Sequence, residues 1–195
     1  MADAPDHDAA TLVALETAIE ALPPLTRVVF LLHRVDDLCY DAIARRLSIG
    51  IPAVESGLAD ALYRLCCTLD GDTGERPMPE VLADANALLS RRYRRYCEDG
   101  LRALGATGAV PWNDDDDDDD AAVMRAMLLL MPEAVRETFI LNRVENLTYR
   151  QIARRMGTFR WIVRRRMLYA IRHIAKRPEP FEDWLQYQAR DRTIR

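Results

Sequence analysis

The sequence contains few of the residue patterns from which catalytic and metal centres are built. None of its three histidines stands with a carboxylate or thiol at a spacing typical of catalysis or metal binding; they are His7, His33 and His173. It also has no glycine-rich loop that would hold a phosphate and no nucleophile paired with a base. We therefore expect no catalytic residue, no cofactor and no metal, and we do not expect an enzyme.

The cysteines lack the paired spacing of a zinc site, and the adjacent Cys66 and Cys67 cannot both ligate one ion comfortably. We interpret all four cysteines, which include Cys39 and Cys97, as reduced thiols of a cytoplasmic protein. Cys39 and Cys66 are expected to be half-buried.

Long hydrophobic runs are missing as well. The apolar stretch at residues 127–131 is far shorter than the roughly 20 residues that a membrane-spanning helix needs. Met1 is followed by acidic residues rather than by the basic and then apolar segments of a signal peptide. The sequence therefore predicts a soluble, cytoplasmic protein that does not use a membrane.

The overall charge is a poor guide to partners because the charges are unevenly distributed. The net charge is −4, which by itself argues against nucleic acid, yet residues 131–177 contain twelve Lys and Arg against three Glu. The acid is concentrated in the N-terminal tail and in seven consecutive aspartates at 114–120. We expect these aspartates to form a solvated spacer; the alternative is that they mimic DNA and shield the basic segment.

An internal repeat organises the chain. At an offset of 109 residues, 14 of the 44 positions in residues 22–65 are identical to their counterparts in 131–174, without a gap. Two copies this far apart indicate two small domains rather than a solenoid. Apolar residues at helical spacing predict helices over about 10–22, 26–35, 40–47 and 52–67 in the first copy.

These patterns predict an all-α protein with two small helix-turn-helix domains. We expect a disordered tail at 1–9, a first domain at 10–69, a linker at 70–120, and a second domain at 121–195 that ends in a short helix over 181–189. The linker is expected to hold one helix or a bent pair at about 80–104, followed by the aspartate run. Its patch at 91–96, Arg-Arg-Tyr-Arg-Arg-Tyr, is favoured as a helix surface with extended arginines over a second nucleic-acid site.

The most informative stretch is the helix-turn-helix of the second copy. Thr148 is predicted to cap a short helix whose apolar residues share one face, and Gly157 is predicted to end it with a positive φ. The next helix, from about Phe159, interleaves arginines with apolar residues. This pattern is typical of a helix that packs on a core and faces DNA.

Each copy is similar to region four of sigma-70-type RNA polymerase sigma factors, especially those of the extracytoplasmic-function group. The resemblance rests on a Leu-Pro or Met-Pro start, an arginine before a hydrophobic helix, an acidic turn and a Tyr-x-x-Ile-Ala-Arg-Arg helix. In the first copy these are Leu22-Pro23, Arg27, Asp36-Asp37-Leu38 and residues 40–47; in the second they are Met131-Pro132, Arg136, Glu145-Asn146-Leu147 and residues 148–157. Nothing in the sequence resembles region two of these factors.

The resemblance implies a DNA-binding regulator of transcription that recognises a promoter −35-like element and contacts RNA polymerase at its β-flap. Contacts with double-stranded DNA are expected from the second copy, with these candidates: Arg150, Arg154, Arg160, Trp161, Arg164, Arg165, Arg166 and Tyr169. Trp161 has a second interpretation, burial beneath Phe181 or Trp184.

The first copy carries Ser56, Gly57 and Asp60 where basic residues are expected. The alternative function is therefore a protein-interaction module. In that hypothesis the first copy binds RNA polymerase, an anti-sigma protein or a second copy of the chain as a homodimer.

Overall fold

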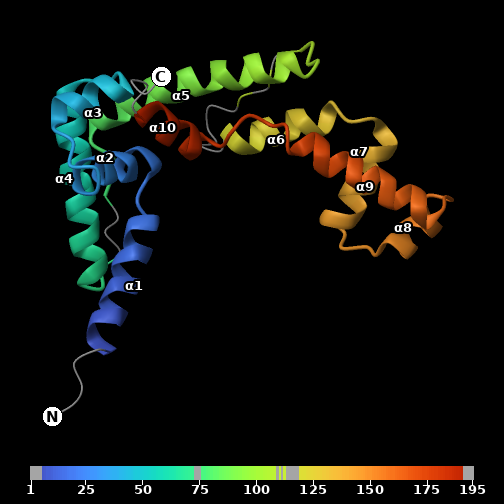
Figure 1. Ribbon diagram of the computed structural model, residues 1–195, viewed down its shortest axis with the longest axis horizontal. Helices are drawn as coiled ribbons and strands as arrows, with labels where there is room; N and C mark the ends of the chain where they lie inside the picture. The colour runs from blue at the N-terminus through green and yellow to red at the C-terminus, as the bar shows by residue number, and fades with distance from the viewer. Residues whose placement is uncertain (1–5, 73–75, 109, 111, 113–118, 191–195) are drawn as a thin grey trace. The chain divides into compact units, whose positions relative to one another are not determined.

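A computed structural model describes residues 6–72, 76–108, 110, 112 and 119–190, with side-chain burial from residue 11 onward. Every regular element among them is an α-helix, which confirms the predicted all-α class (Figure 1). The helices are α1 (Asp6–Glu20), α2 (Pro24–Arg34), α3 (Tyr40–Leu47), α4 (Ile51–Leu69), α5 (Glu80–Ala103), α6 (Asp119–Leu129), α7 (Glu133–Arg143), α8 (Tyr149–Arg155), α9 (Arg160–Ile174) and α10 (Phe181–Ala189). Within the described ranges, no helix combines the length and apolar character needed to cross a membrane.

The chain divides into two compact units. The first unit comprises Met1–Arg91 and Phe181–Arg195, and the second comprises Arg92–Pro180. Each unit holds one copy of the repeat: α1 to α4 in the first and α6 to α9 in the second. The long helix α5 is a single helix rather than a bent pair, and its residues are divided between the units.

The repeat is visible in the backbone as well as in the sequence. Helices α2 and α7 follow prolines with φ of −53° at their N-caps. The turns after them contain Asp37 and Asn146, which stand 109 residues apart and have φ of 52° and 54°. The short helices α3 and α8 are followed by Ser48 and Gly157, with φ of 54° and 59°. Gly157 thus has the positive φ predicted for it, and the two copies share their turns.

The first unit is built on helix α4. Ala61 and Leu65 of α4 pack with Ala18 of α1 and with Leu22, forming a buried cluster. Gly57 also faces inward, because a Cβ atom there would lie 3.4 Å from Leu82 of α5 and 3.4 Å from Val29 of α2. The small residue therefore lets α5 approach α4 closely.

The second unit has two buried clusters that hold α9 in place. Leu141, Ile152, Ala153 and Val163 join α7, α8 and α9. Met131, Val135 and Ala170 join the start of α7 to the middle of α9. Because one face of α9 is anchored along its length, the position of its opposite face is fixed by the core.

Helix α10 differs from its predicted place in the second domain. It belongs to the first unit, where it packs on α2 and α3. Arg27 of α2 forms an ion pair with Glu182, and Arg46 Nη1 of α3 donates a 3.0 Å hydrogen bond to the carbonyl oxygen of Ala189. Trp184 and Leu185 are buried there. The sequence showed that this helix needs an apolar partner, but not which of two similar copies provides it.

Two other expectations about the linker and the tail were wrong. Asp119 and Asp120 are not solvated spacer residues: they form the first turn of α6, where negative charge is favourable. Arg94 Nε donates to Asp119 at 2.8 Å, and Tyr93 Oη donates to Asp120 at 2.6 Å. Helix α1 begins at Asp6, inside the predicted disordered tail. The aspartates at 114–118 lie outside the described residues.

Candidate nucleic-acid interface

Helix α8 begins with the predicted cap. The Thr148 side chain accepts from the backbone N–H of Gln151, and the Gln151 side chain accepts from the backbone N–H of Thr148 at 2.8 Å. This reciprocal capping box satisfies two N–H groups that a helix start would otherwise leave unpaired. The short helix α8 is therefore held at a defined starting point.

The turn before α8 is fixed in a similar way in both copies. Asn142 Nδ2 donates to the carbonyl oxygen of Leu147 at 2.9 Å. In the first copy, His33 Nδ1 lies 2.9 Å from the carbonyl oxygen of Leu38, the equivalent acceptor. Since a carbonyl can only accept, the proton of a neutral His33 resides on Nδ1. This histidine thus has a structural role in the turn.

Helix α9 separates a buried face from an exposed basic face. Val163, Met167 and Ala170 are buried at spacings of three and four residues. The opposite side exposes Arg160, Trp161, Arg164 and Arg165. None of the described acidic residues forms an ion pair with these three arginines. Among the described residues, no carboxylate therefore competes with an external anion for these guanidinium groups.

The remaining predicted site residues differ in their exposure and in their contacts. Arg150 and Arg154 are exposed on α8. Arg166 is half-buried, and its Nη1 lies 3.8 Å from the Met156 sulfur, so it faces the α8–α9 junction more than solvent. Tyr169 is exposed and stacks on His173 further along α9, with ring centroids 6.1 Å apart.

The structure excludes one of the two interpretations of Trp161, its burial beneath the aromatic residues of α10. Its side chain is 63% exposed, so it is not buried beneath Phe181 or Trp184. Those two residues belong to α10, where their rings stack on each other with centroids 6.0 Å apart. Burial of Trp161 is therefore not observed.

A hollow of about 670 Å³ lies between the starts of α8 and α9. It is lined by Tyr149, Phe159, Arg160, Trp161 and Arg164. The sequence prediction omitted Phe159 and Tyr149 from the site. An aromatic residue at the N-cap of α9, where Ser, Thr, Asp or Asn is preferred, was the signal that could have identified Phe159.

The equivalent helix of the first copy, α4, does not present a basic face. Its exposed positions include Ile51, Pro52 and Glu55. Gly57 and Asp60 are buried, so reading them as lost DNA-facing charges was wrong. Asp60 Oδ2 accepts from Arg64 Nε at 2.8 Å and from Thr26 Oγ1 at 3.3 Å. Asp60 thus supports the fold of the first unit.

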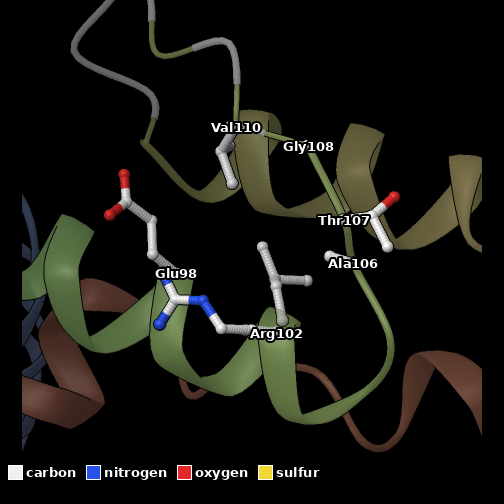
Figure 2. A pocket seen from close by; sticks show the side chains of 7 residues that line it. Glu98, Arg102, Ala106, Thr107, Gly108 and Val110 are labelled. Atoms are coloured by element: carbon white, nitrogen blue, oxygen red, sulfur yellow. The ribbon is translucent and has the colours of Figure 1, made fainter.

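A second hollow, of about 310 Å³, lies at the end of α5 (Figure 2). Glu98 and Arg102 of α5 lie on one side, and Ala106, Thr107 and Val110 lie across from them. Glu98 accepts from the Trp112 indole N–H at 2.7 Å, and Arg102 pairs with Asp99. These charged groups already have partners and therefore support the local fold.

The thiols also differ from expectation. Cys39 and Cys66 are exposed rather than half-buried, Cys67 is half-buried, and Cys97 is buried. Among the residues that the structure describes, no group of three or more His, Cys, Asp or Glu is arranged to hold a metal ion.

Comparison with known proteins supports the resemblance on which the predictions rest. A family model described as sigma-70, region 4 matches residues 12–65 and 122–158. The second match ends one residue before the N-cap of α9, so the place of α9 in the domain rests on its alignment with α4 and on its packing against α7 and α8. No curated protein and no solved structure matches the chain.

The two matched segments coincide with the two copies of the repeat. Both copies have the helix order, the turns and the buried α4 or α9 face described above. The family is one of DNA-binding, non-enzymatic domains that act in transcription. The two matched segments are therefore tandem sigma-70 region 4-like domains.

Proposed function

We propose that the protein regulates transcription by binding double-stranded DNA through its second region 4 domain, at a promoter −35-like element. The exposed basic face of α9, with Arg160, Arg164 and Arg165, is the observation that carries this proposal. It lies on the helix that a helix-turn-helix inserts into the major groove. Arginine forks suit both the phosphates and the O6 and N7 acceptors of guanine.

We assign separate tasks to the neighbouring residues. Helix α8, with exposed Arg150 and Arg154, crosses the DNA backbone and contacts phosphates, which position the domain without reading sequence. The N-terminus of α9 adds its partial positive charge at the same place. Arg166, directed toward Met156, stabilises the α8–α9 junction. Tyr169 lies about 14 Å along the axis from Arg160, so we assign it to the edge of the interface.

The first domain is the scaffold in this proposal. Its α4 exposes Glu55 where α9 has Arg164, and α5 packs against it at Gly57. Its α2 and α3 are covered by α10. We therefore assign DNA binding to the second domain alone.

The test compares the same substitution in the two copies. Arg154→Ala in α8 and Arg45→Ala in α3 remove equivalent arginines, both exposed. Fluorescence anisotropy with promoter duplexes should show weaker binding for Arg154→Ala and unchanged binding for Arg45→Ala. Arg164→Ala combined with Arg165→Ala should cost about 2–6 kcal/mol and reduce the slope of log K against log salt by about one for each lost phosphate contact. Equal losses for Arg45→Ala and Arg154→Ala would contradict the assignment.

A second candidate function is binding of RNA polymerase, and one observation favours the second domain for this as well. In the first domain the face of α2 and α3 is occupied by α10, which is held by Arg27 and Arg46. The second domain has Arg136 and Arg155 at the equivalent positions. On its α7–α8 face Ile140 is exposed, whereas the equivalent Leu31 of the first domain is half-buried. We place the polymerase contact on this face, whereas the sequence had placed the partner on the first domain.

Two matched valines test this placement. Val144 and Val35 are equivalent and are both 72% exposed. Val144→Glu should reduce co-purification of RNA polymerase, because a charge replaces apolar contact surface, while Val35→Glu should leave it unchanged. A loss with Val35→Glu alone would instead support the first domain as the partner site.

A further inference from the structure

The hollow between α8 and α9 is lined by aromatic rings that the fold leaves exposed. Phe159 is 70% exposed and Trp161 is 63% exposed, with Tyr149 beside them. Exposed aromatic residues that line one hollow form a patch of the kind used in interaction sites. Arg160 and Arg164 line the same hollow, so the site combines apolar surface with positive charge.

These residues weaken the helix that carries them. Phe159 occupies the N-cap of α9 without a side-chain hydrogen bond, as Cys39 does in α3 and Gly50 in α4, and its bulky ring is a poor choice at a position where Ser, Thr, Asp, Asn or Gly is preferred. Arg160 follows at the first helical position, where the helix dipole disfavours positive charge. Residues that lower helix stability are expected at positions where function requires their side chains.

The first copy provides the comparison. It keeps a tyrosine, Tyr40, at the place of Tyr149, but its helix start is ordinary: Gly50 is the N-cap of α4 and Pro52 lies in the first turn. Apart from the shared tyrosine, the residues that line the hollow are thus confined to the copy whose helix has a basic face; they are Phe159, Arg160, Trp161 and Arg164. These four residues lie beyond the end of the second family match, at Thr158.

A base edge in the major groove offers these rings one apolar partner. Adenine, guanine and cytosine present hydrogen-bonding groups there, whereas thymine presents a 5-methyl group next to its O4 acceptor. Covering a methyl group removes apolar surface from water on both sides of the contact. The indole N–H of Trp161 is a donor that suits O4, and the neighbouring arginines suit guanine or phosphate.

Resting on the proposed function of α9, we propose that this hollow receives the 5-methyl edge of a thymine in duplex DNA. Phe159 and Trp161 are then specificity-determining residues, and the arginines of the same hollow supply the electrostatic part of binding. The site adds discrimination at thymine positions to the guanine and phosphate contacts already assigned to α9.

The experiment begins with selection of binding duplexes by the full-length chain from a randomised double-stranded library. Each thymine of the selected duplex is then replaced singly by deoxyuridine, which removes only the methyl group. For the wild type, one or two replacements should weaken binding about three- to fivefold. In Phe159→Ala combined with Trp161→Ala the same replacements should have no effect, while Leu168→Ala, an exposed apolar residue further along α9, should behave as the wild type.

Phe159→Thr provides a second variant that guards against misfolding. A threonine cap should raise the melting temperature of the protein while reducing the methyl effect, because stability and recognition are opposed at this position. Retained duplex binding with no sensitivity to deoxyuridine in the wild type would overturn the inference and leave the proposed function intact. Preference for the single strand would also overturn it, as would loss of a protein partner alone in the aromatic variants. Absence of any duplex binding would overturn both proposals.

Discussion

Cys97 has the most perturbed environment of the four thiols. It is fully buried on α5, and burial raises its pKa from about 9 to about 12, with the nearby Asp120 and Asp119 acting in the same direction. Burial and the hydrogen bond to Asp120 also raise the pKa of Tyr93. Both groups are therefore held protonated in the folded state.

The stability of the folded chain should consequently fall at alkaline pH. Cys97 binds its proton more tightly when folded, so its contribution is complete below pH 9 and is lost as pH rises toward 12. Cys97→Ala should flatten the decrease in melting temperature between pH 9 and 12. The exposed Cys66 is the control, and Cys66→Ala should leave the decrease unchanged. A wild-type decrease that survives Cys97→Ala in full would show that other groups cause it.

At the scale of elements, the contact between α4 and α5 depends on one glycine. Gly57 is buried in mid-helix, and the site where its Cβ would stand lies in ordinary contact distance of Leu82 and Val29. The equivalent residue in the second domain is Arg166. The two copies therefore differ at this position of the recognition helix: a buried glycine faces α5 in the first, and a half-buried arginine lies near Met156 in the second.

Two substitutions at Gly57 should distinguish the effect of side-chain volume on stability from the effect of helix propensity. Gly57→Ala adds a single methyl group at tolerable distance and relieves the helix penalty of glycine, so its effect on the free energy of unfolding should lie within about 1 kcal/mol. Gly57→Arg has no room between Leu82 and Val29 and should destabilise by about 3 kcal/mol or more, because a buried charge is added to the overpacking. Urea denaturation of both variants measures this. Similar stability of the two variants would contradict the close α4–α5 contact.

At the scale of the whole molecule, charge is segregated along the chain. The pI is about 5.5 and the net charge is −4, yet the helix-turn-helix of the second domain is strongly basic. Interactions between exposed charges fade over a Debye length of about 8 Å at physiological salt. A polyanion therefore responds to the local basic surface more than to the net charge.

The intact chain should for this reason bind both an anion exchanger and heparin at neutral pH. Arg160→Ala combined with Arg164→Ala and Arg165→Ala should elute from heparin at lower salt. From the anion exchanger the same variant should elute later, because its net charge becomes more negative. Glu55→Gln, at the first-copy position equivalent to Arg164, tests whether heparin responds to local charge alone. This variant should shift the anion-exchange elution and leave heparin elution nearly unchanged.

The sequence by itself determined the all-α class, the internal repeat, the bounds of α2 to α4 to within a few residues, and the start of α8. These features depend on local chemistry: apolar spacing, the Thr148 cap and the positive φ of Gly157 are properties of a few neighbouring residues. The exposure of Arg164 and Arg165 followed from the same spacing, since one face of α9 had to be buried.

Only the tertiary structure decided which copy each peripheral helix covers. Helix α10 follows the second copy in the chain but packs on α2 and α3, and both copies offer an arginine pair that could hold it. The burial of Asp60, the pairing of Asp119 with Arg94 and the hollow at Phe159 likewise depend on residues far apart in the sequence. Periodicity shows that a face must be covered, whereas the partner is selected by packing and charge in three dimensions.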